Sequence, residues 1–197
     1  MSMTNIVFKP WIGKDYETGG IFGKRILVLG ESHYGFTNEE DATNKVVNYV
    51  ISGGSAEWTG TFRKFERSLV GHYTDNEESK KIWNSVAFYN YLQNSMNHPR
   101  QSPKESDFDS SSNAFYKVMN QLKPDLIIAW GITHMYWFMP GEGWTVGAKL
   151  LYENKKDVPN GYYTLDSGKR IRVIWVKHPS AAYSWDKWYK VIKNEIH

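Results

Sequence analysis

Residues Arg25 to Gly30 read Arg-Ile-Leu-Val-Leu-Gly, a short continuous apolar run that ends in glycine. Such a run is typical of a strand buried on both faces of a parallel sheet. The pattern recurs in Asp125 to Gly131, which reads Asp-Leu-Ile-Ile-Ala-Trp-Gly. Together these runs repeat the strand, turn and helix order of βαβ units. We therefore predict an α/β fold, a three-layer α/β/α sandwich around a central, mainly parallel four-stranded sheet.

The segments between these strands carry weaker signals. Thr61 to Leu69 has the spacing of an amphipathic surface helix. Ile82 to Gln93 surrounds a short strand candidate, but its periodicity is ambiguous. Asn94 to Ser112 is rich in Ser, Asn, Asp and Pro and is predicted to be a long loop. Asn113 is the expected N-cap of a helix that ends before Pro124.

The C-terminal part predicts a hairpin and a last helix. Tyr162 to Leu165 and Arg170 to Val176 are β-prone runs on either side of the turn residues Asp-Ser-Gly-Lys. Ser184 is a suitable N-cap for the final helix. Its expected inner positions are Trp185, Trp188, Ile192 and Ile196, and its outer positions are Lys187, Lys190 and Lys193.

Composition bounds the class of protein. The 197 residues suit one domain, 1–197, and 41% hydrophobic with 23% charged residues is near the globular average. The absence of cysteine excludes disulfides, thiolate zinc sites and iron-sulfur clusters. No segment approaches the roughly 18 apolar residues of a membrane span, so we expect no membrane association and a cytoplasmic location. We expect a monomer that uses no metal and no cofactor.

The polar segment after the first strand is the richest candidate site. It reads Gly-Glu-Ser-His-Tyr-Gly over residues 30–35. In α/β sheets, ligands gather beyond the carboxyl ends of the strands. There the carboxylate of Glu31 would position or deprotonate a water molecule. The alternatives are that Glu31 caps the following turn and that His33 only supports the strand end.

Two further elements carry candidate binding groups. His178-Pro179-Ser180 follows the strand Ile171 to Val176, and the proline holds its polar neighbours in a defined geometry. Asn84 and Asn90 each offer a carboxamide whose donors and acceptor suit a heterocycle. Each of these asparagines has an alternative role in satisfying backbone groups of a turn.

Taken in this order, the elements resemble the uracil-DNA glycosylase superfamily over roughly residues 25–188. The stretch Gly30 to Tyr34 is similar to the family's first motif, which holds the water-activating residue. Trp83 to Val86 is similar to the strand with the base-reading asparagine, and Lys123 to Gly131 to a structural strand. His178 to Ser184 is similar to the family's His-Pro-Ser motif and the loop that wedges into DNA.

The resemblance implies a protein that flips a damaged, deaminated base out of DNA and hydrolyses its N-glycosidic bond. Glu31 would orient water and His178 would stabilise the leaving base. The other implied site residues are Ser32, His33, Tyr34, Asn84, Asn90 and Ser180 at the base or nucleotide, with Tyr183 or Trp185 as the wedge into DNA. Lys187 and Lys190 are candidate phosphate contacts, and a solvated helix face is the alternative reading of these lysines. The chain departs from the family at Ser32, where one branch has aspartate, and at His33, where it has proline.

Two other classes of function stay open at the level of sequence. One is a non-catalytic protein that binds a nucleobase, a nucleotide or nucleic acid. The other is a hydrolase similar to erythromycin esterases, which shares the Gly-Glu-Ser-His corner alone. Turnover that depends on Glu31 would separate either enzyme from the binding protein.

Overall fold

The sheet of this protein has seven strands. The computed structural model describes residues 6–36, 39–98, 101–132 and 135–197. Within them the strand order is β1-β3-β2-β4-β9-β8-β5, and neighbours from β3 to β9 are parallel. The strands are β1 (Trp11–Ile12), β2 (Ile26–Gly30), β3 (Val86–Asn90), β4 (Leu126–Trp130), β5 (Trp144–Val146), β8 (Asn160–Thr164) and β9 (Arg170–Val176).

The predicted α/β class with central parallel strands is confirmed, but four strands was too few. The four parallel strands form the centre, and β1, β8 and β5 extend the sheet by antiparallel pairing. Strands of two or three residues, such as β1 and β5, show no period-2 pattern because they are too short. A separate two-stranded ribbon joins β6 (Leu151–Tyr152) to β7 (Lys156–Asp157).

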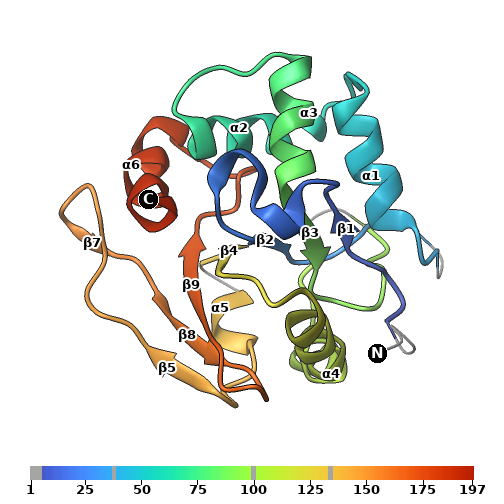
Figure 1. Ribbon diagram of the computed structural model, residues 1–197. Coiled ribbons are helices and arrows are strands. Elements are labelled where there is room, and N and C mark those ends of the chain that lie inside the picture. Colours follow the sequence, from blue (N-terminus) through green and yellow to red (C-terminus); the bar gives the residue numbers. More distant parts are fainter. Residues whose placement is uncertain (1–5, 37–38, 99–100, 133–134) are drawn as a thin grey trace.

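Helices cover both faces of the sheet (Figure 1). One face packs against α1 (Ala42–Ile51), α2 (Thr59–Val70), α3 (Asn76–Ser85) and α6 (Trp185–Ile196). The other packs against α4 (Glu105–Leu122) and α5 (Met135–Phe138). Alternate residues of β2 divide between the two cores, with Ile26 and Val28 on the α2 face and Leu27 and Leu29 on the α4 face.

The ambiguous segment 82–93 proved to be part helix and part strand. Helix α3 begins at a capping box, in which Asp75 accepts from the Glu78 backbone N–H and Glu78 accepts from that of Asp75. It continues through Ser85, and β3 starts at Val86. The resemblance placed a strand at residues 83–86, so this boundary was wrong by three residues.

The predicted loop 94–112 was also too long. Residues 99–100 lie outside the described part, but α4 begins at Glu105, eight positions before the expected cap Asn113. Asp107 supports this start by accepting from the Lys104 backbone N–H at 2.8 Å. The serines and aspartates that suggested a loop lie mainly on the solvent side of the helix, while Phe108 is fully buried.

The hairpin and the final helix predicted for the C-terminal part are found at the expected positions. β8 and β9 form the antiparallel hairpin, and Ser184 precedes α6 at the N-cap position. Trp188, Ile192 and Ile196 are buried, and Trp185 is only partly so. The helix predicted at residues 61–69 is the body of α2. None of the helices in the described residues is long and apolar enough to span a membrane.

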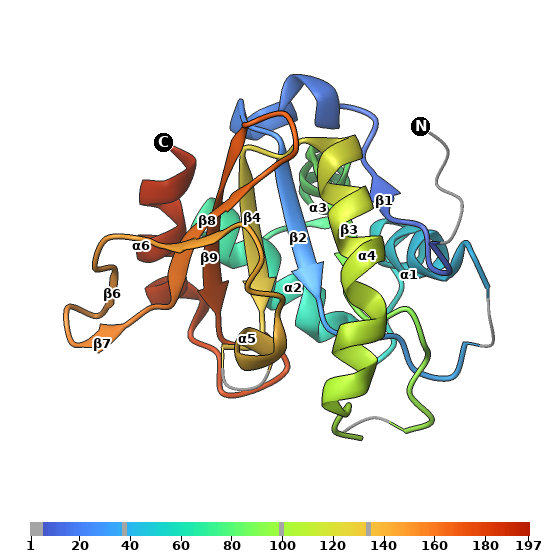
Figure 2. The same cartoon turned by 90° about the horizontal axis from the view of Figure 1, so that it is seen from below.

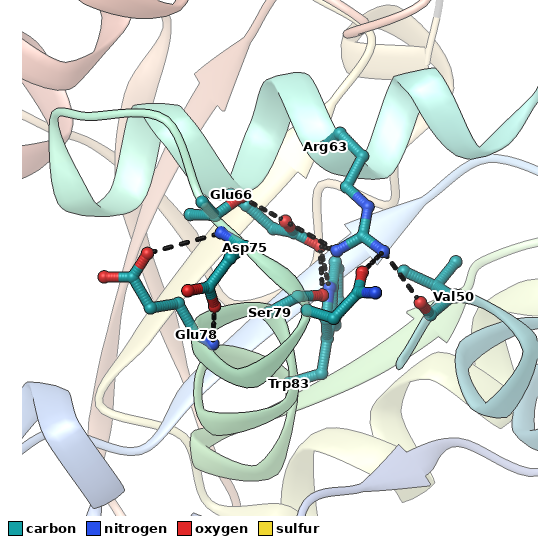
Figure 3. A network of polar contacts seen from close by, with 9 residues as sticks. Val50, Arg63, Glu66, Asp75, Glu78, Ser79 and Trp83 are labelled. Carbon is teal, nitrogen blue, oxygen red and sulfur yellow. Dashed lines mark hydrogen bonds and ion pairs between the residues drawn. The ribbon is translucent and has the colours of Figure 1, made fainter. Parts of the chain in front are cut away.

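A buried carboxylate ties α2 to α3 (Figure 3). Glu66 of α2 is fully buried and accepts from Ser79 Oγ at 2.7 Å and from Trp83 Nε1 at 2.8 Å. Thr74 Oγ1 donates to its other oxygen at 2.8 Å, and Arg63 Nη1 lies 3.3 Å from the same oxygen. A buried charge is tolerated only when it is paired and hydrogen-bonded, as Glu66 is here. The network therefore stabilises the packing of α2 against α3.

Candidate functional site

The carboxyl ends of the parallel strands meet at one edge of the sheet. Figure 2 shows the arrowheads of β2, β4 and β9 at the same end, with α5 beside them. The register pairs Gly30 with Asn90 and Trp130 with Val176. Adjacent strands lie roughly 4.8 Å apart, so the ends of β2 and β9, on either side of β4, are separated by about 10 Å. Residues after these strands therefore converge on one region.

Asn90 lies across the end of β2. A Cβ atom on Gly30 would come within 2.1 Å of Asn90 Oδ1, so the absence of a side chain at Gly30 makes room for the carboxamide. Asn90 is 6% exposed, and its side chain makes no hydrogen bond within the described part of the chain at standard geometry. The donor and acceptor atoms of this carboxamide are therefore available to a ligand at the carboxyl edge.

His178 is held as a neutral hydrogen-bond donor. Its Nδ1 lies 2.7 Å from Ser180 Oγ and accepts from the Ser180 backbone N–H at 3.2 Å. Burial lowers the pKa of His178 from 6.5 to about 4. Because Nδ1 is an acceptor and the ring is neutral near pH 7, we infer that the remaining proton is on Nε2. The ring also makes an edge contact with Trp130, with centroids 5.7 Å apart.

The segment after β2 brings a carboxyl and a hydroxyl to the edge. Glu31 is partly buried, and its backbone carbonyl accepts from the Leu92 N–H at 2.9 Å. This bond and the one from the Tyr91 N–H to the Gly30 carbonyl, also 2.9 Å, hold the start of the segment against the end of β3. Ser32 Oγ is buried and has no hydrogen-bond partner among the residues described. A buried hydroxyl without a partner costs about 1–3 kcal/mol, which bound water or ligand would recover.

His33 belongs to the core rather than to an open site. It is 3% exposed, its Nε2 lies 2.9 Å from Thr43 Oγ1, and Phe8 and Phe36 contact its ring edge to face. The structure therefore favours its supporting role over the predicted substrate contact. Tyr34 is 40% exposed and is tied to Met96 by a backbone bridge.

The burial of His33 predicts a pH dependence of stability. Burial lowers the pKa of its imidazole to about 4, whereas the unfolded chain has the ordinary value of 6.5. The unfolded state therefore gains a proton first as the pH falls, and stability should be lost between pH 6.5 and 4. The full shift corresponds to a loss on the order of 3 kcal/mol. Urea unfolding of the wild type and His33→Phe across this range measures it.

In that experiment the stability of His33→Phe relative to wild type should rise as the pH falls. His98→Gln is the matched control, because His98 is an exposed histidine outside the core. Parallel curves for wild type and His33→Phe would contradict the prediction.

Asn84 lies away from the site. It lies in the last turn of α3, just before the amino end of β3, and its backbone carbonyl accepts from the Asp15 N–H at 2.9 Å. Asn90, by contrast, ends β3 at the carboxyl edge. The structure therefore does not bring Asn84 together with Glu31 and His178, and its role in base recognition stays a prediction. The sequence could not decide between the two asparagines because the boundary between α3 and β3 was ambiguous.

Tyr183 is a packing residue in this structure. It is 9% exposed, donates from its hydroxyl to Ser68 Oγ at 2.8 Å and stacks on Trp188 with centroids 6.0 Å apart. A wedge role would require it to leave this pocket between α2 and α6. Lys187 is paired with Glu153 at 2.7 Å, and Lys190 is exposed.

The structure adds a basic and aromatic patch that the sequence did not single out. The guanidinium of Arg67 lies 4.1 Å above the ring of Tyr73, and Tyr73 contacts Trp185 edge to face at 5.6 Å. Arg67 makes no ion pair within the described ranges, and its Nε is buried without a hydrogen-bond partner there. We call Arg67, Tyr73 and Trp185 the α2–α6 patch. In the sequence, Arg67 was one basic residue of an amphipathic helix.

Two hollows among the described residues lie elsewhere. One is an open surface depression between α1 and α3, lined by residues that include Lys45, Tyr49 and Lys80. The other lies beside α5 and includes Trp175. Glu31, Asn90 and His178 line neither of these two hollows.

Comparison with known proteins assigns no family to this arrangement. No protein-family model matches the chain, and no curated protein matches it at a significant level.

Proposed function

We propose that this protein binds a nucleobase at the carboxyl edge of its sheet and hydrolyses the N-glycosidic bond of that base in DNA, as the resemblance to uracil-DNA glycosylases implies. One observation carries the proposal. The ends of β2, β3 and β9 bring a carboxyl group, a carboxamide and a neutral imidazole to one edge, on Glu31, Asn90 and His178.

Each of the three groups fits a separate task. The planar carboxamide of Asn90 offers donor and acceptor atoms that match the edge of a base. His178 Nε2–H would donate to a base carbonyl on which negative charge develops as the bond to the sugar breaks. Glu31 would orient the water whose oxygen bonds to the sugar carbon, and would accept its proton before that proton passes to the departing base.

The chain differs from the family motif at Ser32 and His33, and both differences are compatible with the proposal. Ser32 stands where one branch of the family has aspartate, and its buried Oγ lacks a partner in the described residues. A hydroxyl cannot act as the carboxylate base, so the proposal assigns that task to Glu31. His33 replaces a proline and stabilises the turn by packing between Phe8 and Phe36.

The α2–α6 patch supports DNA as the partner. Trp185 begins α6 directly after the loop that carries His178 and Ser180, so the patch adjoins the proposed base site. An Arg guanidinium without a carboxylate partner suits a phosphate, and exposed aromatic rings suit stacking with bases. Tyr73 is 69% exposed, so its ring is available for such a contact. Three acidic residues lie within two positions of the patch residues in the sequence: Glu66, Asp75 and Asp186.

The proposal is tested by base release from oligonucleotides that contain uracil, hypoxanthine, xanthine or an oxidised base. We expect release of at least one base, and a fall of about 10²-fold or more in the Glu31→Gln variant, which is typical of losing a general base. Glu77→Gln is the matched control, because Glu77 is an exposed carboxylate of α3.

Three outcomes of this experiment would contradict the proposal in different ways. Binding of an oligonucleotide without release of any base would indicate a non-catalytic reader. Absence of both binding and release would exclude DNA as the substrate. The alternative of an esterase-type hydrolase would then be tested with p-nitrophenyl esters. Release that is equal in the wild type and Glu31→Gln would remove Glu31 from the mechanism.

A further inference from the structure

Helix α5 presents one exposed tryptophan at the end of a strand. Tyr136 contacts Trp175 of β9, with ring centroids 5.4 Å apart. Phe138 stacks on Phe108 of α4, with centroids 5.2 Å apart. Trp137 lies between these two packed residues in the sequence, yet its side chain is 74% exposed. Its ring is therefore presented to solvent from a turn that is anchored on both sides.

The topology of the sheet places α5 between the strands that lead to Glu31 and His178. β4 lies between β2 and β9, and α5 follows β4. The Gly131 N–H donates to the Val176 carbonyl at 3.0 Å, and the Gly131 carbonyl accepts from the Tyr136 N–H at 3.3 Å. These bonds hold α5 at the carboxyl ends of β4 and β9, where Figure 2 shows it. The exposed indole of α5 therefore belongs to the same edge as the proposed base site.

Exposed aromatic rings flank this edge on both faces of the sheet. The α2–α6 patch adjoins the core on the α2 face, whereas α5 packs on the core of the α4 face. Tyr73 of the patch is 69% exposed, which is similar to the exposure of Trp137. A DNA strand that crosses the edge with one base between Glu31 and His178 would meet a ring on each side. The edge thus offers stacking surface in both directions from the base site.

An exposed indole is suited to the face of a nucleobase. Every base has such a face, so stacking on an aromatic side chain adds affinity without depending on the sequence. In a duplex, both faces of a base are covered by its neighbours in the stack. A single strand leaves these faces accessible to aromatic side chains. The rings beside the site therefore favour a single strand over a duplex.

We propose that the substrate is single-stranded DNA and that Trp137 stacks on a base next to the one that enters the site, an inference that rests on the proposed function for DNA as the partner. The contact removes part of the indole from water and involves no charge. Its contribution to affinity should therefore change little with salt, unlike that of a phosphate contact.

The test is the binding of a short fluorescein-labelled oligothymidylate with 2′-fluoroarabinouridine at its centre, because the fluorine slows cleavage of the bond to the base. Fluorescence anisotropy gives the dissociation constant for the full chain. We expect Trp137→Leu to weaken binding by roughly tenfold, the loss of one stacked base, and Trp137→Phe to retain most of the affinity. Trp58→Leu is the matched control, because Trp58 is also exposed, at 44%, and packs against Tyr49 of α1.

A second strand identifies what the indole contacts. In this strand the thymines beside the uridine are replaced by abasic tetrahydrofuran residues, which keep the phosphates and lack the bases. Trp137→Leu should then lose much less than tenfold, because the stacking partner is already absent. A duplex that contains the original labelled strand should bind the wild type more weakly and should depend little on Trp137.

Three results would overturn the proposal. They are equal affinity of wild type and Trp137→Leu for the intact strand, an equal loss on the abasic strand, and a loss on the duplex as large as on the single strand. Trp137-dependent binding without base release would contradict the proposed function alone. Base release with unchanged binding by Trp137→Leu would contradict this inference alone. Failure of the wild type to bind any strand would overturn both.

Discussion

Replacement of Glu66 by alanine should lower the free energy of unfolding by about 3–5 kcal/mol, the usual cost of breaking a buried ion pair from one side. The carboxylate accepts hydrogen bonds from Ser79, Trp83 and Thr74 and neutralises Arg63. The substitution leaves these donors without an acceptor in a region that water does not reach. It also weakens the contact between α2 and α3 that Figure 3 shows.

The measurement is denaturant unfolding followed by circular dichroism. Glu77→Ala, an exposed carboxylate on the facing helix α3, is the control and should change stability by less than about 0.5 kcal/mol. Glu66→Gln keeps one acceptor oxygen for Ser79 and Trp83, so it should cost less than Glu66→Ala. A loss for Glu66→Ala no larger than that of the control would show that the network contributes little.

Replacement of His178 by alanine should lower the rate of base release by roughly 10²–10³-fold, the usual effect of removing one donor to a developing oxyanion. This effect requires a neutral imidazole ring. Burial holds the pKa of His178 at about 4, and Ser180 occupies Nδ1, so Nε2–H is the available donor. Ser180→Ala keeps the backbone N–H bond to Nδ1 and should cost less than tenfold.

Single-turnover release from the substrate identified in the panel separates the chemical step from binding. His197→Ala is the matched control, because His197 is an exposed histidine at the C-terminal end of α6, away from the carboxyl edge and from the α2–α6 patch. Unfolding curves of each variant should show that the fold is retained. Full activity of a folded His178→Ala protein would exclude His178 from the reaction.

Local sequence was sufficient where one signal dominated. The apolar runs at β2 and β4 predicted buried parallel strands, and turn residues predicted the hairpin of β8 and β9. The final helix was predicted from its cap and its period of 3.6. In each case the pattern of apolar and polar residues within one short segment shows which side chains are buried. The element could therefore be predicted from residues that are close in the sequence.

Local sequence failed where long-range contacts decided the outcome. Residues 105–112 are polar enough for a loop, but the burial of Phe108 and Ser111 against the sheet makes them the first turns of α4. The short edge strands β1 and β5 exist because a longer neighbour offers unpaired backbone groups. Tertiary packing overrides weak propensity in such segments.

The candidate site divides in the same way. By itself the sequence determined that polar groups follow the buried strands at Glu31 and His178. These positions drew attention because ligands of open α/β sheets bind beyond the carboxyl ends of the strands. Only the tertiary structure decided that Asn90 and not Asn84 ends at that edge, that His33 and Tyr183 are packed, and that Arg67 meets Tyr73 and Trp185. These outcomes depend on strand register and on the packing of α2 against α6, which join residues far apart in the chain.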